Sequence, residues 1–254
     1  MTGFHVEVGD RTAVVTIDRP KANAIDAATS KAMGEAFAEL DGNPAVRAII
    51  LTGAGPKFFS AGWDLTAAEE FDSDYGVGGF GGFPELPNRS TPVIAAVNGM
   101  AVGGGFEIAM AADLIVAADH AQFWLPEPAI GILPDAGSVK LPRLLPPHVA
   151  RELLLTGRRM DAVEGHRWGL IANVVPADEL LQAAHLLADA IAASAPLSIA
   201  ALLDIERRTV NLSTDEAMAA LKSLASYRRA IDSDDAREGQ AAFGERRPPV
   251  WKGR

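Results

Sequence analysis

The stretch that decides the fold is NGMAVGGGFEIAMAADLIVAADHAQFWLPEPAIGILPDAG, which spans residues 98–137. It follows an apolar run at residues 93–97 that is typical of a buried strand. The chain then passes through three consecutive glycines, residues 103–105, and enters a short helical pattern over residues 106–112. Glycines let a backbone approach a ligand closely, because no Cβ stands in the way. The stretch therefore predicts a strand, a ligand-accessible loop and a helix in succession.

This stretch contains two glutamates. Glu107 lies one turn into the predicted helix, and Glu127 follows a second apolar run, between two prolines. Free N–H groups at a helix start favour a developing negative charge. A carboxylate beside such donors, with a second one on a later loop, indicates acid–base chemistry on a group that becomes an oxyanion. The alternatives are that Glu107 only complements the helix dipole and that Glu127 is an exposed loop residue.

A strand followed by a loop with a carboxylate recurs along the chain. The segments at residues 47–65, 92–111 and 113–132 each run from a buried strand into a loop that carries glycine or proline. We interpret this as a loose structural repeat that stacks strands into a coil-like sheet, with no fixed sequence period.

The regions on either side of these repeats have simpler patterns. Residues 4–17 predict two strands joined by a turn at Gly9 and Asp10. Apolar residues at helical spacing predict a helix that ends near Asn43. After Pro142 the chain becomes helical, with amphipathic patterns at residues 180–191 and 217–225. We divide the chain into an α/β core at residues 1–193 and a helical oligomerisation region at residues 194–254.

A glycine-rich segment at residues 72–88 interrupts the pattern. It has the length of a functional loop, and it contains a formal G-x-G-x-x-G at residues 76–81. No strand precedes this match and Pro84 would break a following helix, so it does not support a dinucleotide site.

Composition excludes several classes of function. The chain has 254 residues, 48% of them hydrophobic, and it carries a net charge of −10 without a long basic run, which argues against nucleic acid as a partner. The absence of cysteine excludes disulfides and thiolate sites, and the five histidines show no metal-ligand spacing. Neither a membrane span nor a secretory signal is visible. We therefore expect a cytoplasmic protein with no membrane partner and no metal.

Three ordered motifs resemble the crotonase (enoyl-CoA hydratase/isomerase) superfamily. They are FSAGWDL at residues 59–65, AVGGGFEIAMAAD at residues 101–113 and FWLPEPAIGILPDAG at residues 123–137. WGL at residues 168–170, SAPLSIAAL at residues 194–202 and the C-terminal AAFGERRPPVWKGR are similar to members that act on crotonobetainyl-CoA and carnitinyl-CoA. The resemblance implies an α/β spiral of ββα units with a C-terminal helical trimerisation region, assembled as a homotrimer or as a hexamer made of two trimers.

The resemblance also implies a set of site residues. It places Glu107 and Glu127 as the catalytic pair, and it gives the backbone N–H groups of Trp63 and Gly104 to an oxyanion hole for the thioester carbonyl. The remaining positions that it assigns to CoA or substrate are Ala22, Ala61, Gly62, Asp64, Leu65 and Gly103. Asp64 has a plainer alternative, as a cap of a following helix. Coenzyme A would be present only as part of the substrate, with no permanently bound cofactor.

The sequence departs from the family pattern at one position that bears on the identity of the acyl group. Asp135 stands where many plain hydratases carry glycine, which puts an unbranched enoyl-CoA in doubt. The trimethylammonium of crotonobetaine is best held by aromatic faces, and Trp63, Phe80, Phe83 and Trp124 lie in or between the motifs. The alternative is that these aromatics line a pocket for an ordinary acyl tail.

Three functions stay open at this point. The first is a lyase that adds or removes water across the double bond of crotonobetainyl-CoA, and the second is a generic short-chain enoyl-CoA hydratase or an isomerase. The third, from another class, is a CoA-binding scaffold subunit without activity. The presence of both glutamates favours a hydratase.

Overall fold

Two sheets form the centre of the computed structural model, which describes residues 3–67 and 73–254. The larger sheet has six strands in the order β1-β2-β3-β5-β7-β10. Only β1 and β2 pair antiparallel, as the predicted hairpin, and the other neighbours are parallel. The bounds are β1 Phe4–Val8, β2 Thr12–Ile17, β3 Ala48–Gly53, β5 Val93–Val97, β7 Leu114–Ala118 and β10 Asn173–Val175.

The smaller sheet has four strands in the order β4-β6-β8-β9. Its strands are β4 Phe58–Ser60, β6 Met100–Val102, β8 Gln122–Trp124 and β9 Met160–Asp161. Along the chain β3 is followed by β4, β5 by β6, and β7 by β8, so each repeat gives one strand to each sheet. This alternation is a spiral of stacked units, and it confirms the coil-like repeat predicted from the sequence.

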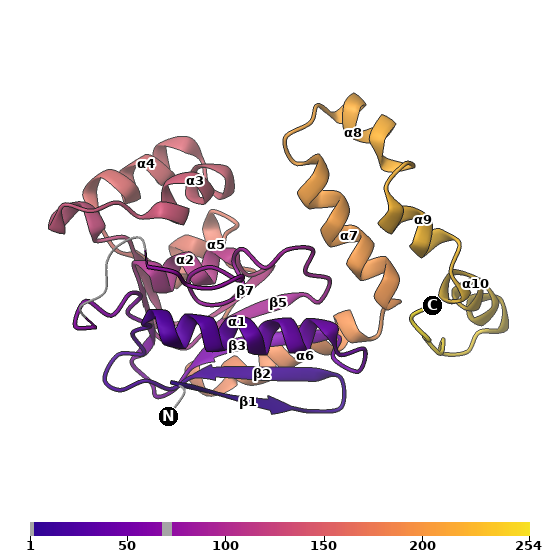
Figure 1. The fold of residues 1–254 in the computed structure, drawn as a ribbon, viewed down its shortest axis with the longest axis horizontal. Helices are drawn as coiled ribbons and strands as arrows, with labels where there is room; N and C mark the ends of the chain where they lie inside the picture. The colour runs from indigo at the N-terminus through magenta and orange to yellow at the C-terminus, as the bar shows by residue number, and fades with distance from the viewer. Residues whose placement is uncertain (1–2, 68–72) are drawn as a thin grey trace.

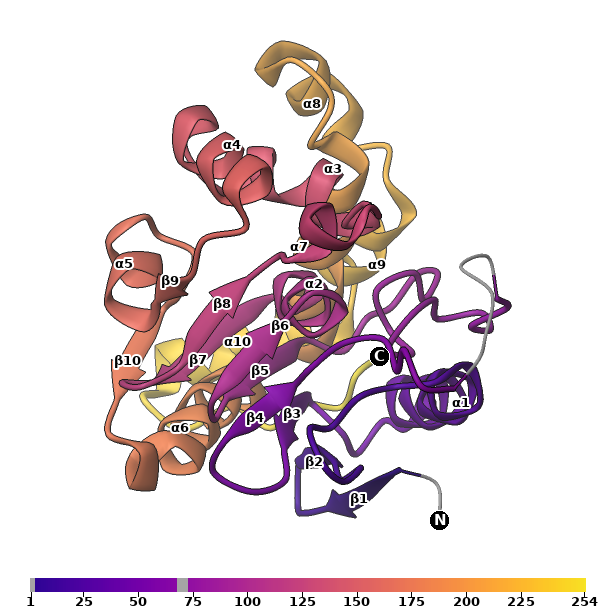
Figure 2. The same cartoon turned by 90° about the vertical axis from the view of Figure 1, so that its left-hand side faces the viewer.

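Burial explains why these segments form strands. Every residue of β3 and of β5 is buried, as expected for strands of a parallel sheet that is covered on both faces. Helix α6, Leu180–Ala192, packs on the larger sheet, while α2, Gly104–Ala111, packs on β4, β6 and α3. Figure 2 shows α2 beside β6, between the sheets and α3. Phe106 of α2 and Phe123 of β8 meet in the core with ring centroids 5.3 Å apart.

Most predicted helices are present with shifted ends, but the one predicted over residues 217–225 is divided, because residues 222–224 are not helical. Helix α1, Ala27–Gly42, is capped by Asn43, where the sequence placed its end. Helix α2 begins at Gly104, two residues earlier than predicted, because Gly103 turns the chain with a φ of 55°. The remaining helices are η1 Glu127–Ile130, α3 Asp135–Leu144, α4 Pro147–Thr156, α5 Ala162–Arg167, η2 Ala177–Glu179, α7 Pro196–Thr209, α8 Thr214–Leu221, α9 Ala225–Ile231 and α10 Asp234–Glu245.

The C-terminal helices lie beside the α/β body rather than around it. Figure 1 shows α7, α8, α9 and α10 on one side of the sheets. They bury little: α7 buries only Ala201, and α8 buries no residue. Large apolar side chains stay exposed there, including Leu202, Met218 and Phe243. A division at residue 194 and an oligomerisation role for these helices stay predictions.

In the described parts of the chain, no single helix is long and apolar enough to cross a membrane. Residues 177–192 and 196–209 have the length and composition only when taken together, across a bend of 102°.

Candidate active site

A cavity of about 370 Å³ contains both predicted catalytic glutamates. It lies where the turn after β4, the glycine-rich loop, the start of α2 and the segment from η1 to α3 meet. The lining residues are Trp63, Tyr75, Phe80, Pro84, Glu85, Gly104, Glu107, Ile108, Glu127, Ile132, Leu133, Asp135 and Ala136. Segments far apart in the sequence therefore converge on one hollow, as expected of a ligand site.

Backbone packing brings the two predicted oxyanion donors together. A Cβ on Gly62 would lie only 2.7 Å from the backbone nitrogen of Gly104, so the turn that carries Trp63 rests directly against the start of α2. Gly62 has a φ of 81°, which other residues rarely adopt. Gly104 is the first residue of α2, and its N–H has no acceptor within the helix.

A short parallel bridge orients the Trp63 backbone. The N–H of Ile25 donates to Gly62 O over 2.8 Å, and Ile25 O accepts from the N–H of Asp64 over 2.9 Å. Ile25 is thus bonded to the carbonyl of the residue before Trp63 and to the N–H of the residue after it. In a parallel pairing of this kind, the N–H of Trp63 itself points away from Ile25.

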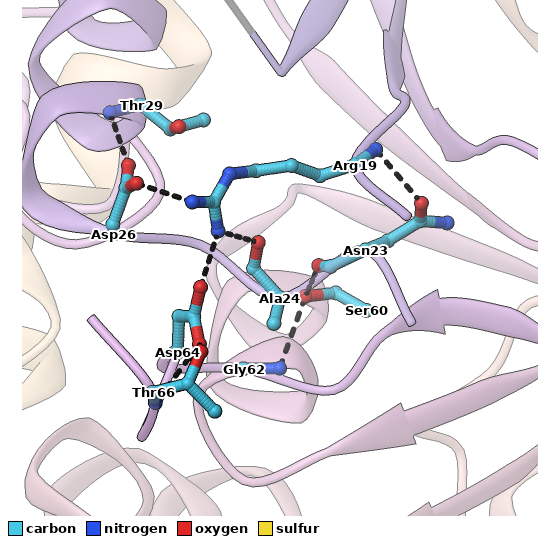
Figure 3. A network of polar contacts seen from close by, with 9 residues as sticks. All are labelled: Arg19, Asn23, Ala24, Asp26, Thr29, Ser60, Gly62, Asp64 and Thr66. Atoms are coloured by element: carbon cyan, nitrogen blue, oxygen red, sulfur yellow. Dashed lines mark hydrogen bonds and ion pairs between the residues drawn. The ribbon is translucent and has the colours of Figure 1, made fainter. Parts of the chain in front are cut away.

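The guanidinium of Arg19 links the segment around Ile25 to the turn that carries Trp63. It donates to the Asp64 carboxylate over 2.8 Å and to Ala24 O over 2.8 Å, and it also pairs with Asp26. Figure 3 shows Arg19 between Asp26, at the start of α1, and Asp64, next to Trp63. Hydrogen bonds from Thr66 and Arg19 hold the pKa of Asp64 below its usual range.

Glu107 is held by the start of another helix. Its Oε1 accepts a hydrogen bond of 2.7 Å from the N–H of Gly137 in the first turn of α3. Burial raises the pKa of Glu107, and the charge of Asp135 adds to this, while backbone N–H groups of Gly137 and Ala136 act in the opposite direction. The carboxylate is therefore desolvated but oriented by main-chain donors.

Glu127 has fewer partners. The residue is 8% exposed, and within residues 3–67 and 73–254 its buried Oε2 has no hydrogen-bond partner. Burial raises the pKa of Glu127 to about 7, with further contributions from the negative charges of Glu107 and Asp135. Gly103 makes room for this side chain, since a Cβ there would lie 2.7 Å from Glu127 Oε1. A carboxyl that titrates near neutral pH can both give and take a proton.

Several other predicted site residues lie around the cavity rather than in its wall. The N–H of Ala61 donates to Ala22 O over 2.9 Å, so these two predicted CoA-binding positions are joined through their backbones. Leu65 is 64% exposed beside them. Asp64 faces Arg19 and Thr66, and it caps no helix in the described chain.

Two predicted aromatics do not line the cavity. Phe83 is buried in the core, with its ring centroid 4.8 Å from that of Phe37. Trp124 stacks with Arg159, whose guanidinium carbon lies 4.4 Å from the ring centroid. Trp63, Phe80 and Asp135 do line it. The sequence could not distinguish these cases, because a core aromatic and a substrate-contacting aromatic have the same composition signal.

Other wall residues were not singled out from the sequence. Tyr75, Pro84 and Glu85 come from the glycine-rich loop, which had been marked as functional only as a whole. Ile108 follows Glu107 on α2, whereas Ile132 and Leu133 lie between η1 and α3. The sequence does not single out Arg19 either, since nothing local reveals a partner 45 positions away.

The comparison with known proteins decides the family. The model of the enoyl-CoA hydratase/isomerase family matches residues 7–254. The chain belongs to the enoyl-CoA hydratase/isomerase family. Members of this family with solved structures share the fold along the entire chain: an enoyl-CoA hydratase from Mycobacterium tuberculosis superposes with a TM-score of 0.92 at 38% identity and covers 100% of both chains.

Curated relatives in this family are more similar still. A carnitinyl-CoA dehydratase from Proteus mirabilis is 52% identical, covering 99% of this chain and 98% of its own length. A carnitinyl-CoA dehydratase from Escherichia coli is 54% identical over 94% of each chain. The resemblance seen in the three motifs is thereby confirmed over nearly the full length.

Proposed function

We propose that this protein is a lyase that adds water to, or removes it from, the α,β double bond of an enoyl-CoA thioester. One observation carries the proposal: Glu107 and Glu127 face one cavity whose wall also contains Trp63 and Gly104. In hydration, the oxygen of water bonds to the β-carbon, and the electrons of the double bond move onto the thioester oxygen as an enolate. Two preorganised N–H donors stabilise such an oxyanion by about 3–4 kcal/mol each, by analogy with acyl-transfer sites.

The two carboxyl groups divide the proton transfers. Glu107 takes a proton from the attacking water, because the N–H of Gly137 orients its carboxyl group over 2.7 Å and favours the ionised form against the effect of burial. Glu127 gives a proton to the α-carbon, since its pKa of about 7 leaves it partly protonated at neutral pH. In dehydration the two roles are exchanged.

For the acyl group we propose crotonobetainyl-CoA, with carnitinyl-CoA as the hydrated partner. The names of the similar dehydratases support this, and so do Trp63, Phe80 and Asp135 in the cavity wall. Cation–π contacts contribute roughly 0.5–2 kcal/mol each. We expect kcat/KM for crotonobetainyl-CoA to exceed that for a neutral tert-butyl analogue by at least about tenfold, or 1.4 kcal/mol. Equal kcat/KM values for the two substrates would contradict the crotonobetainyl assignment and would favour a generic short-chain enoyl-CoA hydratase.

The competing functions make different predictions. An isomerase moves a proton with one glutamate, whereas this cavity holds both Glu107 and Glu127. A CoA-binding scaffold would show no turnover at all. Loss of the enoyl-thioester absorbance of crotonyl-CoA separates an enzyme from a scaffold, and the product's mass, with or without one added water, separates a hydratase from an isomerase.

We also propose how the substrate's CoA moiety and the subunits are arranged. The joined backbones at Ala22 and Ala61, with the segment through Leu65, would hold the adenine, and CoA would be present only as part of the thioester. Exposed apolar side chains on α7 to α10 support a homotrimer or a hexamer. A monomeric peak in light scattering at micromolar concentration would contradict this oligomeric state. A cytoplasmic location stays a prediction.

A further inference from the structure

The wall of the cavity contributed by the glycine-rich loop carries a carboxylate that hydration does not use. Glu85 lines this wall together with Tyr75 and Phe80. The two rings meet edge to face, with centroids 5.3 Å apart and planes at 85°. This wall therefore combines an aromatic pair with a negative charge.

The charge of the whole cavity is one-sided. Its lining includes the four carboxyl groups of Glu85, Glu107, Glu127 and Asp135, and no described lining residue is lysine, arginine or histidine. Two of these groups suffice for the proton transfers, and an apolar acyl tail needs none. Bringing carboxylates together is unfavourable, and Lys140, which acts on Glu107 and Glu85 from outside the lining, is a single positive charge against four carboxyl groups. The excess of negative charge is explained if the ligand brings a cation.

The loop fixes the position of Glu85. Its backbone N–H donates to Gly78 O over 2.9 Å, and its side chain lies across Gly79, where a Cβ would be 2.8 Å from Oε1. Within the described ranges, no ion pair closer than 4 Å and no hydrogen bond occupies this carboxylate. Lys140 is near enough to be influenced by Glu85, but it does not line the cavity.

We propose that Tyr75, Phe80 and Glu85 form the subsite for a quaternary ammonium group at the end of the acyl chain. This inference rests on the proposed function, because it places the acyl group in this cavity. A trimethylammonium cannot donate hydrogen bonds, so aromatic faces and a nearby carboxylate are the groups that can recognise it. Since Glu85 is exposed, its attraction for the cation weakens as salt is added.

The test compares two carboxylates of the same loop. Glu85→Gln removes the charge from the wall, and Asp74→Asn removes an exposed carboxylate that pairs with Lys31 instead. For each variant, kcat/KM is measured with crotonobetainyl-CoA and with the neutral tert-butyl analogue. We expect Glu85→Gln to lower the ratio of cation to neutral by at least about fivefold, or 1 kcal/mol, and Asp74→Asn to keep it. Added salt should lower the ratio of the wild type more than that of Glu85→Gln.

The contribution of the aromatic rings is tested with two variants of Tyr75. Tyr75→Leu should lower the same ratio, whereas Tyr75→Phe, which keeps the ring, should preserve it. A wild type that prefers the cation, with a ratio unchanged in Glu85→Gln, would overturn the subsite and leave the proposed acyl group intact. A Glu85→Gln enzyme that loses rate equally on both substrates would also overturn it. A wild type without any preference would instead remove the acyl assignment itself.

Discussion

The N–H of Gly137 donates to Oε1 of Glu107 over 2.7 Å and joins the first turn of α3 to the catalytic face of α2. Glu127 lacks such a donor at its Oε2 within the described residues. Two carboxyl groups in one cavity thus have different hydrogen-bond surroundings, and a difference of this kind suits them to opposite roles in proton transfer.

The pH dependence of hydration follows from Glu127. Its pKa is raised to about 7, chiefly by burial, so its proton is lost as the pH rises through neutrality. We expect kcat/KM for hydration to fall above about pH 7, with an apparent pKa that belongs to the pair of glutamates. The measurement is a rate profile from pH 5 to 9. A rate that stays flat or rises up to pH 9 would mean that a protonated Glu127 is not needed.

The stability of the fold should depend on the same group. A carboxyl whose pKa is raised in the folded state stabilises the fold below its unfolded pKa of 4.5, and this contribution is lost as the pH rises to about 7. Glu127→Gln, which cannot ionise, should therefore unfold at a higher temperature than the wild type at pH 8. The shift corresponds to at most about 3 kcal/mol.

The control for this stability prediction is the same pair of proteins at low pH. Near pH 4.5 Glu127 is protonated in the folded chain, so calorimetry should show most of the difference between the two melting temperatures disappear. A difference of equal size at both pH values would assign the effect to packing rather than to ionisation.

The contact between Gly62 and Gly104 can be tested with a matched glycine. Gly62→Ala brings a Cβ to 2.7 Å from the nitrogen of Gly104 and must displace one backbone from the other. We expect kcat to fall by about 10²–10³, the loss typical of one oxyanion donor. Gly55 also has a positive φ, of 78°, but open space around it. Gly55→Ala should therefore keep the activity, and an equal loss in both variants would point to backbone strain instead.

Arg19 should act on the rate through the turn that carries Trp63. Arg19→Ala removes the hydrogen bond to Asp64, and we expect kcat to fall about tenfold with a smaller change in KM. The fold should lose about 1.5–3 kcal/mol, the range for hydrogen bonds to charged groups. Rates are compared ten degrees below each variant's melting temperature, so that unfolding does not contribute. Recovery of kcat in Arg19→Lys would show that charge alone suffices and that the guanidinium geometry does not matter.

Local patterns in the sequence were enough for most of the fold. The largely apolar runs of β3, β5 and β7 and the helical spacing in α1 and α6 specify their own elements. The alternation of strands between two sheets was also visible as a repeat. The start of α2 depended on Gly103, which has a positive φ and no room for a Cβ beside Glu127, a residue 24 positions away in the sequence.

The site was less predictable, because its wall depends on which side of a loop each residue faces. Phe80 and Phe83 are three positions apart in one loop, yet Phe80 lines the cavity and Phe83 packs on Phe37. Glu85 reaches the wall only because Gly79 leaves room for its side chain. Such placement results from long-range packing, which single-sequence patterns do not contain.

The central claim is that Glu107 and Glu127 together perform the hydration, and the most direct measurement is single-turnover conversion of crotonobetainyl-CoA. Absorbance follows the loss of the enoyl thioester, and mass spectrometry follows the addition of one water. We predict that Glu107→Gln and Glu127→Gln each lower the rate by about 10²–10⁴, while Glu35→Gln, on the exposed face of α1, retains it. Near-normal formation of the hydrated product in either cavity variant would contradict the account.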